Sequence, residues 1–195
     1  MSTTPVPHPL TTQQQDAFMR LLDTHHAAFV RYVRAMTRDS EQARDIVAES
    51  LLIGLERFHT LREPASFLFF LIAIARRLFW RSGRWGRLFL RLEEKHEDLA
   101  IDAAAAPDLQ PDLRLLHECI ARLPARQREA LALFELAGLR LEEIRELQGG
   151  SLSGVKSRIA RARQRLAAQL NEHDAEAVKK RSEATIEGME IEAES

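Results

Sequence analysis

The chain has 195 residues, of which 45% are hydrophobic and 29% charged, and its formal net charge is −1. This composition excludes a wholly disordered chain, and the low numbers of glycine (8) and proline (7) disfavour an all-β sandwich or barrel. The single cysteine, Cys119, excludes an intramolecular disulfide. Because the longest apolar run, residues 67–75, is too short to cross a bilayer, we expect a cytoplasmic protein without membrane insertion.

The first half of the chain has the apolar spacing of three helices. We expect the first helix to allow a break near His25 and His26, and the second to be capped by Ser40. Pro64 interrupts the pattern and predicts a loop before the third helix. The expected helices begin near residue 11, at residue 40 and at residue 66, and the third ends near residue 80.

Charge is strongly segregated in the middle of the chain. Residues 76–91 contain six arginines and no acid, whereas residues 93–112 contain seven acids and one lysine. Prolines and an alanine run interrupt any amphipathic pattern in the acidic segment, which we interpret as a flexible linker between two small helical domains. The predicted parts are a disordered tail at 1–10, a first domain at 11–92, the linker at 93–112, a second domain at 113–171 and an acidic tail at 172–195.

The second domain contains the pattern of a helix-turn-helix. A short helix at 141–147, the pair Gly149-Gly150 and a long helix at 152–170 have the required order and lengths. A preceding helix is expected at 125–137. The predicted fold class is therefore all-α, with a helix-turn-helix in the second of the two domains.

In the last predicted helix, an apolar stripe at helical spacing is expected to hold the helix on the domain, and the outward face is basic; the stripe consists of Val155, Ile159, Ala162 and Leu166. Positive side chains follow one another between residues 151 and 171 without any acid, whereas a solvated face usually alternates in sign. Arginine and lysine in this position can contact phosphates or guanine edges in a major groove, which favours DNA binding over a merely solvated surface. The candidate DNA contacts are Ser153, Gly154, Lys156, Ser157, Arg158, Arg161 and Arg163.

Aromatic residues lie among the arginines of residues 67–91, where five phenylalanines and both tryptophans occur. Exposed aromatic rings stack on unpaired bases, so this segment suits melted, single-stranded DNA. Phe67, Phe69 and Phe70 fit equally well in a hydrophobic core, whereas Trp80 and Trp85 stand within the arginine cluster.

The second helix presents Asp45, Glu49, Leu52 and Glu56 at helical spacing, opposite its apolar stripe. This pattern indicates either a protein-docking face or a solvated helix. The histidines have no metal-ligand spacing, Cys119 lies on an apolar stripe, and neither a phosphate-binding loop nor a nucleophile elbow occurs. We therefore expect no catalytic site, no cofactor and no metal.

Taken together, the motifs of the two domains resemble bacterial extracytoplasmic-function (ECF) sigma factors. The sequences ARDIVAES (43–50) and IAIARR (72–77) resemble sigma region 2. The sequences LPARQREA (123–130), GLRLEEI (138–144) and GVKSRIARAR (154–163) resemble sigma region 4. The resemblance implies a protein that binds core RNA polymerase and directs promoter-specific transcription initiation by recognising the −10 and −35 elements.

The resemblance also implies roles for particular residues. The face with Asp45, Glu49, Leu52 and Glu56 corresponds to the surface that docks on the polymerase β′ clamp helices, and region 4 corresponds to the part that meets the β flap. Residues 153–163 correspond to the −35 recognition helix. The −10 contacts implied by the resemblance are His59, Thr60, Arg62, Arg76, Arg77, Trp80, Arg81 and Arg84.

Two other functions remain open at this point. One is a helix-turn-helix regulator that binds DNA without polymerase, which would have no need to stack unpaired bases. The other is a sigma-like decoy that binds an anti-sigma factor without touching a promoter. An anti-sigma factor is also an expected partner of a true sigma factor of this family.

Overall fold

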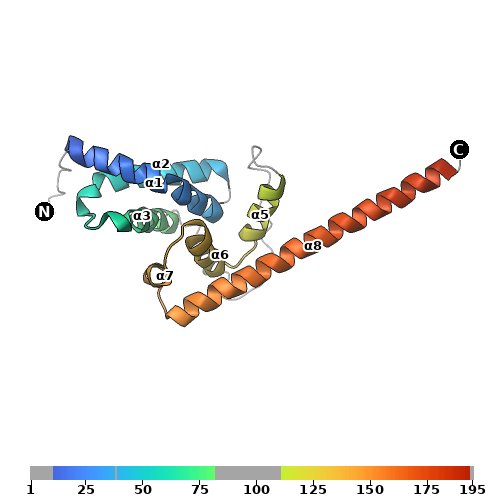
Figure 1. Ribbon diagram of the computed structural model, residues 1–195. Helices are drawn as coiled ribbons and strands as arrows, with labels where there is room; N and C mark the ends of the chain where they lie inside the picture. The colour runs from blue at the N-terminus through green and yellow to red at the C-terminus, as the bar shows by residue number, and fades with distance from the viewer. Residues whose placement is uncertain (1–10, 38, 82–110, 194–195) are drawn as a thin grey trace.

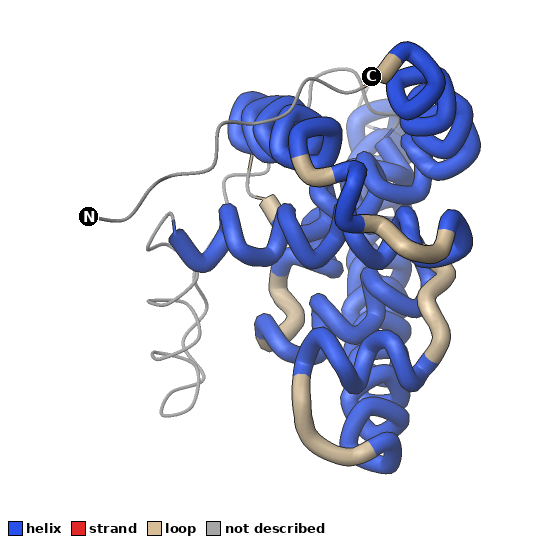
Figure 2. The backbone as a smooth tube through the Cα atoms, turned by 90° about the vertical axis from the view of Figure 1, so that its left-hand side faces the viewer, coloured by secondary structure: helices blue, strands red, loops and turns tan. Residues whose placement is uncertain are grey.

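The structure is a computed structural model that describes residues 11–37, 39–81 and 111–193, with the backbone alone described at 80, 111–112 and 177–193. All regular secondary structure within these ranges is helical (Figure 1, Figure 2). The predicted all-α fold class is confirmed. The N-terminal tail and most of the predicted linker lie outside the described residues.

Three helices form the first unit of the fold. They are α1 (Thr12–Met36), α2 (Ser40–Glu56) and α3 (Phe67–Arg81), and the 3-10 turns η1 (Phe58–Thr60) and η2 (Pro64–Ser66) connect the last two. Each helix packs on the other two, so their apolar faces enclose one core.

The helix boundaries in this unit differ from the prediction at two places. α1 runs through His25 without a break, because the stretch contains no glycine or proline and the imidazole lies against Phe67, with 6.0 Å between ring centroids. Asp39 caps α2 in place of Ser40, because its Oδ1 accepts a hydrogen bond from the Gln42 backbone N–H at 2.6 Å.

The core of the first unit is built from edge-to-face aromatic rings and one close helix contact. The Phe18 ring lies 5.3 Å from that of Phe67 and 5.5 Å from that of Phe58. Gly54 lets α2 approach α3 closely, since a Cβ at this position would meet Leu71 Cδ2 at 2.7 Å. The half-buried Phe58 ring of η1 packs on Phe18 and Phe67, and this packing fixes where the loop between α2 and α3 begins.

The second unit contains the predicted helix-turn-helix. Its elements are α5 (Pro111–Ala121), α6 (Ala125–Leu131), the π-helical turn η4 (Ala132–Leu136), α7 (Leu141–Gln148) and α8 (Leu152–Ala193). The expected single helix at 125–137 therefore widens at Ala132, whose carbonyl accepts from the Ala137 N–H five residues later at 3.0 Å.

α8 is much longer than the pattern predicted. The pattern predicts an end near residue 170, whereas the helix continues to Ala193, is 42 residues long in all and extends beyond the rest of the molecule (Figure 1). Residues 171–187 contain neither glycine nor proline and are rich in alanine, glutamate and lysine, which are good helix formers. Nothing in the local sequence therefore ends the helix at residue 170.

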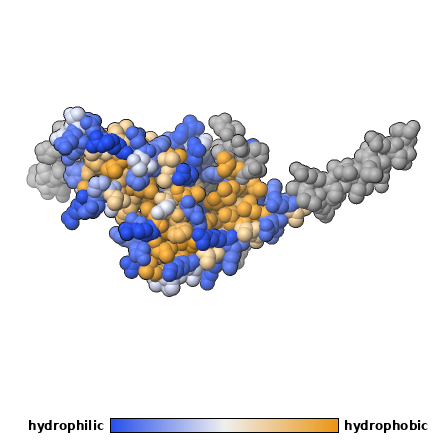
Figure 3. Space-filling view, viewed as in Figure 1, coloured by the Kyte–Doolittle hydropathy of each residue, from blue (hydrophilic) through white to orange (hydrophobic). Residues whose placement is uncertain are grey.

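The two units pack against each other. α1 contacts α5, α6 and η4, and the buried residues of both units join in one hydrophobic cluster. On the face seen in Figure 3, apolar residues gather over the second unit. The packing brings the middle of α3 close to the end of α7, although the two are far apart in the sequence.

Candidate nucleic-acid interface

The turn of the helix-turn-helix is set by two glycines, one backbone hydrogen bond and one side-chain hydrogen bond. Gly149 and Gly150 have φ of 74° and 88°, a region that favours glycine. The Gly149 N–H donates to the Arg145 carbonyl at 2.7 Å, which ends α7. At the start of α8, the Ser151 Oγ accepts from the Gly154 N–H at 3.1 Å. The direction of α8 relative to α7 is thus determined by local backbone geometry.

α8 has one buried face and one exposed face at this end. Val155, Ile159 and Ala162 are buried against the second unit, as the spacing predicted. The opposite face is exposed and carries Ser153, Lys156, Ser157, Ala160, Arg161 and Gln164, with Gly154 half-buried beside it. Within the described ranges, neither Lys156 nor Arg161 takes part in an ion pair. This face is open to a ligand of opposite charge.

Two of the predicted DNA contacts are directed at the protein itself. The Arg158 Nη2 donates to the Gly149 carbonyl at 3.3 Å, and burial, together with the nearby Arg126 cation, lowers the Arg158 pKa. Arg163 donates from Nε to the Glu135 carboxylate at 2.8 Å and lies 5.4 Å from the Phe134 ring centroid. Arg158 and Arg163 therefore stabilise the turn and the packing of α8 on η4.

The proposed docking face on α2 is exposed at its centre. Asp45 and Glu56 are exposed, and Leu52, at 59%, is the most exposed of the three large hydrophobic side chains that are exposed among the described residues. Glu49 is half-buried and forms an ion pair with Arg81 at the end of α3. Three of the four predicted residues thus form an open acidic face with an apolar centre.

The predicted −10 residues fall into separate groups. His59, Thr60 and Arg62 are exposed in the loop between α2 and α3, where the Thr60 hydroxyl donates to the Arg57 carbonyl at 2.7 Å. Arg77 and Arg81 are exposed on α3. The Trp80 side chain and all of Arg84 lie outside the described residues.

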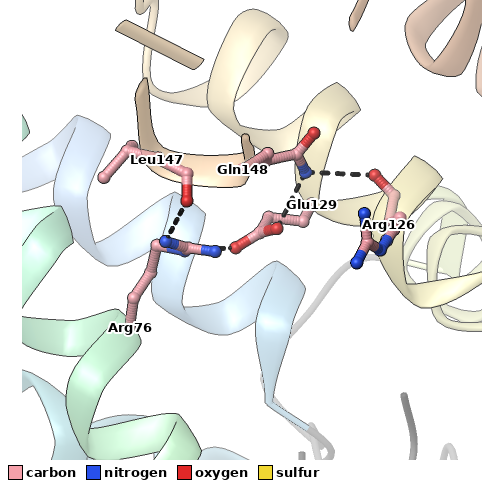
Figure 4. A network of polar contacts seen from close by, with 5 residues as sticks. All are labelled: Arg76, Arg126, Glu129, Leu147 and Gln148. Atoms are coloured by element: carbon pink, nitrogen blue, oxygen red, sulfur yellow. Dashed lines mark hydrogen bonds and ion pairs between the residues drawn. The ribbon is translucent and has the colours of Figure 1, made fainter. Parts of the chain in front are cut away.

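Arg76 does not join these exposed cations. Its Nε donates to Glu129 Oε1 on α6 at 2.6 Å, and its Nη1 donates to the carbonyl of Leu147 at the end of α7 (Figure 4). The Arg76 side chain is 17% exposed and that of Glu129 is 2% exposed. An arginine predicted to meet promoter DNA is therefore held by the second unit.

Both oxygens of the Glu129 carboxylate accept a hydrogen bond. Gln148 Nε2 donates to Glu129 Oε2 at 2.8 Å and to the Arg126 carbonyl at 3.1 Å (Figure 4). We call the Glu129 carboxylate, the Leu147 carbonyl and the Gln148 side chain the Glu129 socket. Burial raises the pKa of the nearby Tyr32 phenol well above its ordinary range, an effect that the charge of Glu129 reinforces and that of Arg76 opposes. The buried Tyr32 phenol is thus held in its neutral form.

The sequence reading missed Glu129, Gln148 and Tyr32. Glu129 carried a usable signal, because it stands four residues after buried Ala125 and four before buried Leu133, on the apolar side of α6. A carboxylate at such a position requires a buried partner. The pattern does not say that the partner comes from the other unit.

One further hydrogen bond joins α1 to the second unit, because the Arg31 Nη2 donates to the Leu136 carbonyl at 3.5 Å. On α5, burial lowers the pKa of His117, and the positive charge of Arg34 on α1 lowers it further.

The described residues give no sign of a metal centre or a membrane span. No group of three or more histidine, cysteine, aspartate or glutamate side chains gathers among them in a way that would hold a metal ion. None of the described helices is both long enough and apolar enough to cross a membrane. Burial raises the pKa of the Cys119 thiol, as expected for a core cysteine.

Comparison with protein families identifies both units. Sigma-70 region 2 matches residues 21–86, and Sigma-70, region 4 matches residues 113–166. The matched ranges fall within the first and second predicted domains. They contain the α2 face, α3, the helix-turn-helix and the Glu129 socket.

Individual relatives agree with this result. The probable RNA polymerase sigma factor RfaY of Xanthomonas campestris pv. campestris is 32% identical over 168 residues, which are 81% of this chain and 41% of the relative. The sigma factor SigV of Bacillus subtilis is 29% identical over 157 residues, which are 77% of this chain and 89% of the relative. The sigma factor RpoE from Bartonella quintana, solved in complex with the anti-sigma factor NepR, has a similar fold, with a TM-score of 0.62, 23% identity and coverage of 83% of this chain and 98% of that one. The chain therefore belongs to the ECF-type RNA polymerase sigma factors, a non-enzymatic family with sigma-70 regions 2 and 4.

Proposed function

We propose that this protein is a sigma factor that binds core RNA polymerase in the cytoplasm and directs it to promoters through −10 and −35 recognition. The observation that carries the proposal is the exposed, acid-free face of α8 with Lys156 and Arg161. This helix is the second of the helix-turn-helix, and its opposite, apolar face is buried. The N-terminal part of such a helix enters the major groove, where these cations meet phosphates and base edges.

Region 2 supports the polymerase part of the proposal. The exposed Leu52 among the acids of α2 has the apolar centre and polar rim of a protein-docking surface. We propose that it binds the β′ clamp helices and that region 4 meets the β flap. The exposed loop residues His59, Thr60 and Arg62 would then lie next to the melted −10 strand, followed by Arg77 and Arg81 on α3.

An anti-sigma factor is the third proposed partner. The structure of the Bartonella quintana relative contains such a partner, NepR, bound to the sigma factor. The same fold over most of this chain supports an equivalent regulator here.

Run-off transcription with the host's core polymerase tests the proposal. The template is the DNA upstream of the protein's own gene, and the variants are the double charge reversal Lys156→Glu with Arg161→Glu and, as a control, Glu142→Gln on the exposed side of α7. We expect a discrete transcript that depends on the protein, is retained by the control and is lost in the double variant.

The other outcomes discriminate among the remaining functions. DNA binding without a transcript and without co-elution with core polymerase would replace the proposal with a polymerase-independent regulator. Binding of an anti-sigma factor, with neither DNA binding nor polymerase binding, would replace it with a decoy.

A further inference from the structure

The Glu129 socket gives Arg76 a use that competes with its predicted one. The resemblance to region 2 assigns Arg76 to the promoter strand, whereas the structure places its guanidinium between a carboxylate of α6 and the last turn of α7. Carboxylate and phosphate oxygens are equivalent acceptors for an arginine side chain. A side chain that is 17% exposed and already bound at Nε and Nη1 has little of its donor surface left for a phosphate.

We propose that Arg76 alternates between the Glu129 socket in the free chain and the promoter strand in the initiation complex, so that the packing of region 4 on region 2 restrains DNA binding until the two units separate. This inference rests on the proposed function, because it assigns a regulatory state to the same DNA-binding residues. It requires that the contact be breakable and that each side have a stable alternative when it breaks.

The chemistry of the socket meets both requirements. A buried ion pair contributes little net stability, because the desolvation of the two ions offsets most of their attraction. When the units separate, Glu129 and Gln148 come into contact with water, and Arg76 joins exposed Arg77 on the same helix. The packed state is therefore one that a competing polyanion can displace.

Other contacts between the two regions also bind cations of region 2 to acceptors in region 4. Arg31 of α1 binds a carbonyl at the end of η4, and Arg76 binds one at the end of α7, so region 2 donates cations to the negative ends of helical segments in region 4. An open hollow lined by Phe69, Ala73, Arg77 and Glu146 borders the Arg76 contact, where α3 meets α7. Solvent and ligands reach the edge of the contact through this hollow.

Two variants of the full chain test the alternation. Both are expected to separate the two units, but they are expected to differ in their affinity for DNA. Glu129→Gln removes the charge of the socket and leaves Arg76 available, whereas Arg76→Gln breaks the same contact and removes the DNA contact as well. Glu142→Gln is the matched control, since it makes the same chemical change at an exposed position of region 4. Thermal unfolding of each variant establishes that it is folded.

Two readouts are needed. Small-angle X-ray scattering reports the separation of the units, and titration with a short fluorescent single-stranded DNA of mixed sequence reports binding by region 2 without polymerase. We expect a larger radius of gyration for Glu129→Gln and Arg76→Gln, and an affinity gain of about tenfold for Glu129→Gln alone, which corresponds to an open fraction of about one tenth in the unmodified chain.

Either of two results would overturn the proposal. If Glu129→Gln has the dimensions of the control, the socket does not hold the units together. If it opens but binds DNA no better than the control, the contact is structural and restrains nothing. If the unmodified protein gives no run-off transcript while these expected effects are observed, the sigma function is overturned, and what stands is that the packing of the two units restrains single-stranded DNA binding.

Discussion

The two surfaces assigned to promoter DNA differ in their availability. On α8, Lys156 and Arg161 are exposed, while the arginines that are tied down, Arg158 and Arg163, support the turn and the packing of the helix. On α3, Arg77 and Arg81 are exposed, but Arg76 is enclosed by the other unit. The exposed face of the proposed recognition helix is therefore open in the packed chain, whereas Arg76 becomes available on the proposed −10 surface only if region 4 moves away.

The largest expected effect comes from comparing a substitution on the buried face of α8 with one on its exposed face. Ile159→Ala removes a buried side chain, and we expect the free energy of unfolding to fall by about 2–5 kcal/mol. Arg161→Ala, two residues away and exposed, is expected to change it by less than about 0.5 kcal/mol while weakening promoter binding by about 1–3 kcal/mol. Chemical denaturation and DNA titration measure the two effects. Equal destabilisation by both variants would mean that Arg161 belongs to the packed side.

The next largest expected effect is a loss of stability in region 2, when a side chain is added where α2 closely approaches α3. Gly54→Val places a Cβ 2.7 Å from Leu71 Cδ2, so the helices must move apart at a cost of about 1–3 kcal/mol. Ala48→Val, on the exposed side of the same helix, is the control and loses only helix propensity, about 0.6 kcal/mol. Thermal unfolding compares the two, and equal melting temperatures would contradict the close contact.

The salt dependence of DNA binding distinguishes a phosphate contact from a supporting residue. Lys156→Ala is expected to reduce the slope of log K against log salt by about 1, because one fewer counterion is released. Arg158→Ala is expected to lower affinity at every salt concentration and leave the slope unchanged, because its guanidinium binds the Gly149 carbonyl. A reduced slope for Arg158→Ala would assign it to DNA after all.

The smallest expected effect is on the pH dependence of folding stability, and it comes from His117 on α5. The pKa of His117 is held below its ordinary value, so below about pH 6.5 the unfolded chain binds more protons than the folded one and stability falls as pH falls. His117→Gln should therefore lose less stability between about pH 7.5 and 5.5 than the unmodified chain does. Exposed His26→Gln is the control. Denaturant titrations at both pH values provide the measurement, and an unchanged pH dependence in His117→Gln would refute it.

Sequence reasoning succeeded where a pattern is local. The spacing of Val155, Ile159 and Ala162 predicted the buried side of α8, and Gly149-Gly150 predicted the turn, because both depend on helix periodicity and backbone preference. The motifs of both regions then predicted the family. These signals involve residues that are close together in the chain.

The interface between the units was not predictable in this way. Arg76 meets Glu129, 53 positions later in the sequence, and no periodicity reports such a contact. Glu129 on the apolar side of α6 showed only that some partner was needed. The length of α8 was missed for a different reason, since an acidic segment without an apolar stripe gave no packing signal although its residues favour a helix.

The continuity of α8 has a mechanical consequence. Its 42 residues form one rod about 60 Å long, so the recognition helix and residues 171–193 rotate together. Tilting region 4 by about 10° about the start of α8 would displace the far end by about 10 Å. The C-terminal end of α8 is therefore a lever arm that amplifies any reorientation of region 4, and a probe attached there reports movements that are small at the DNA.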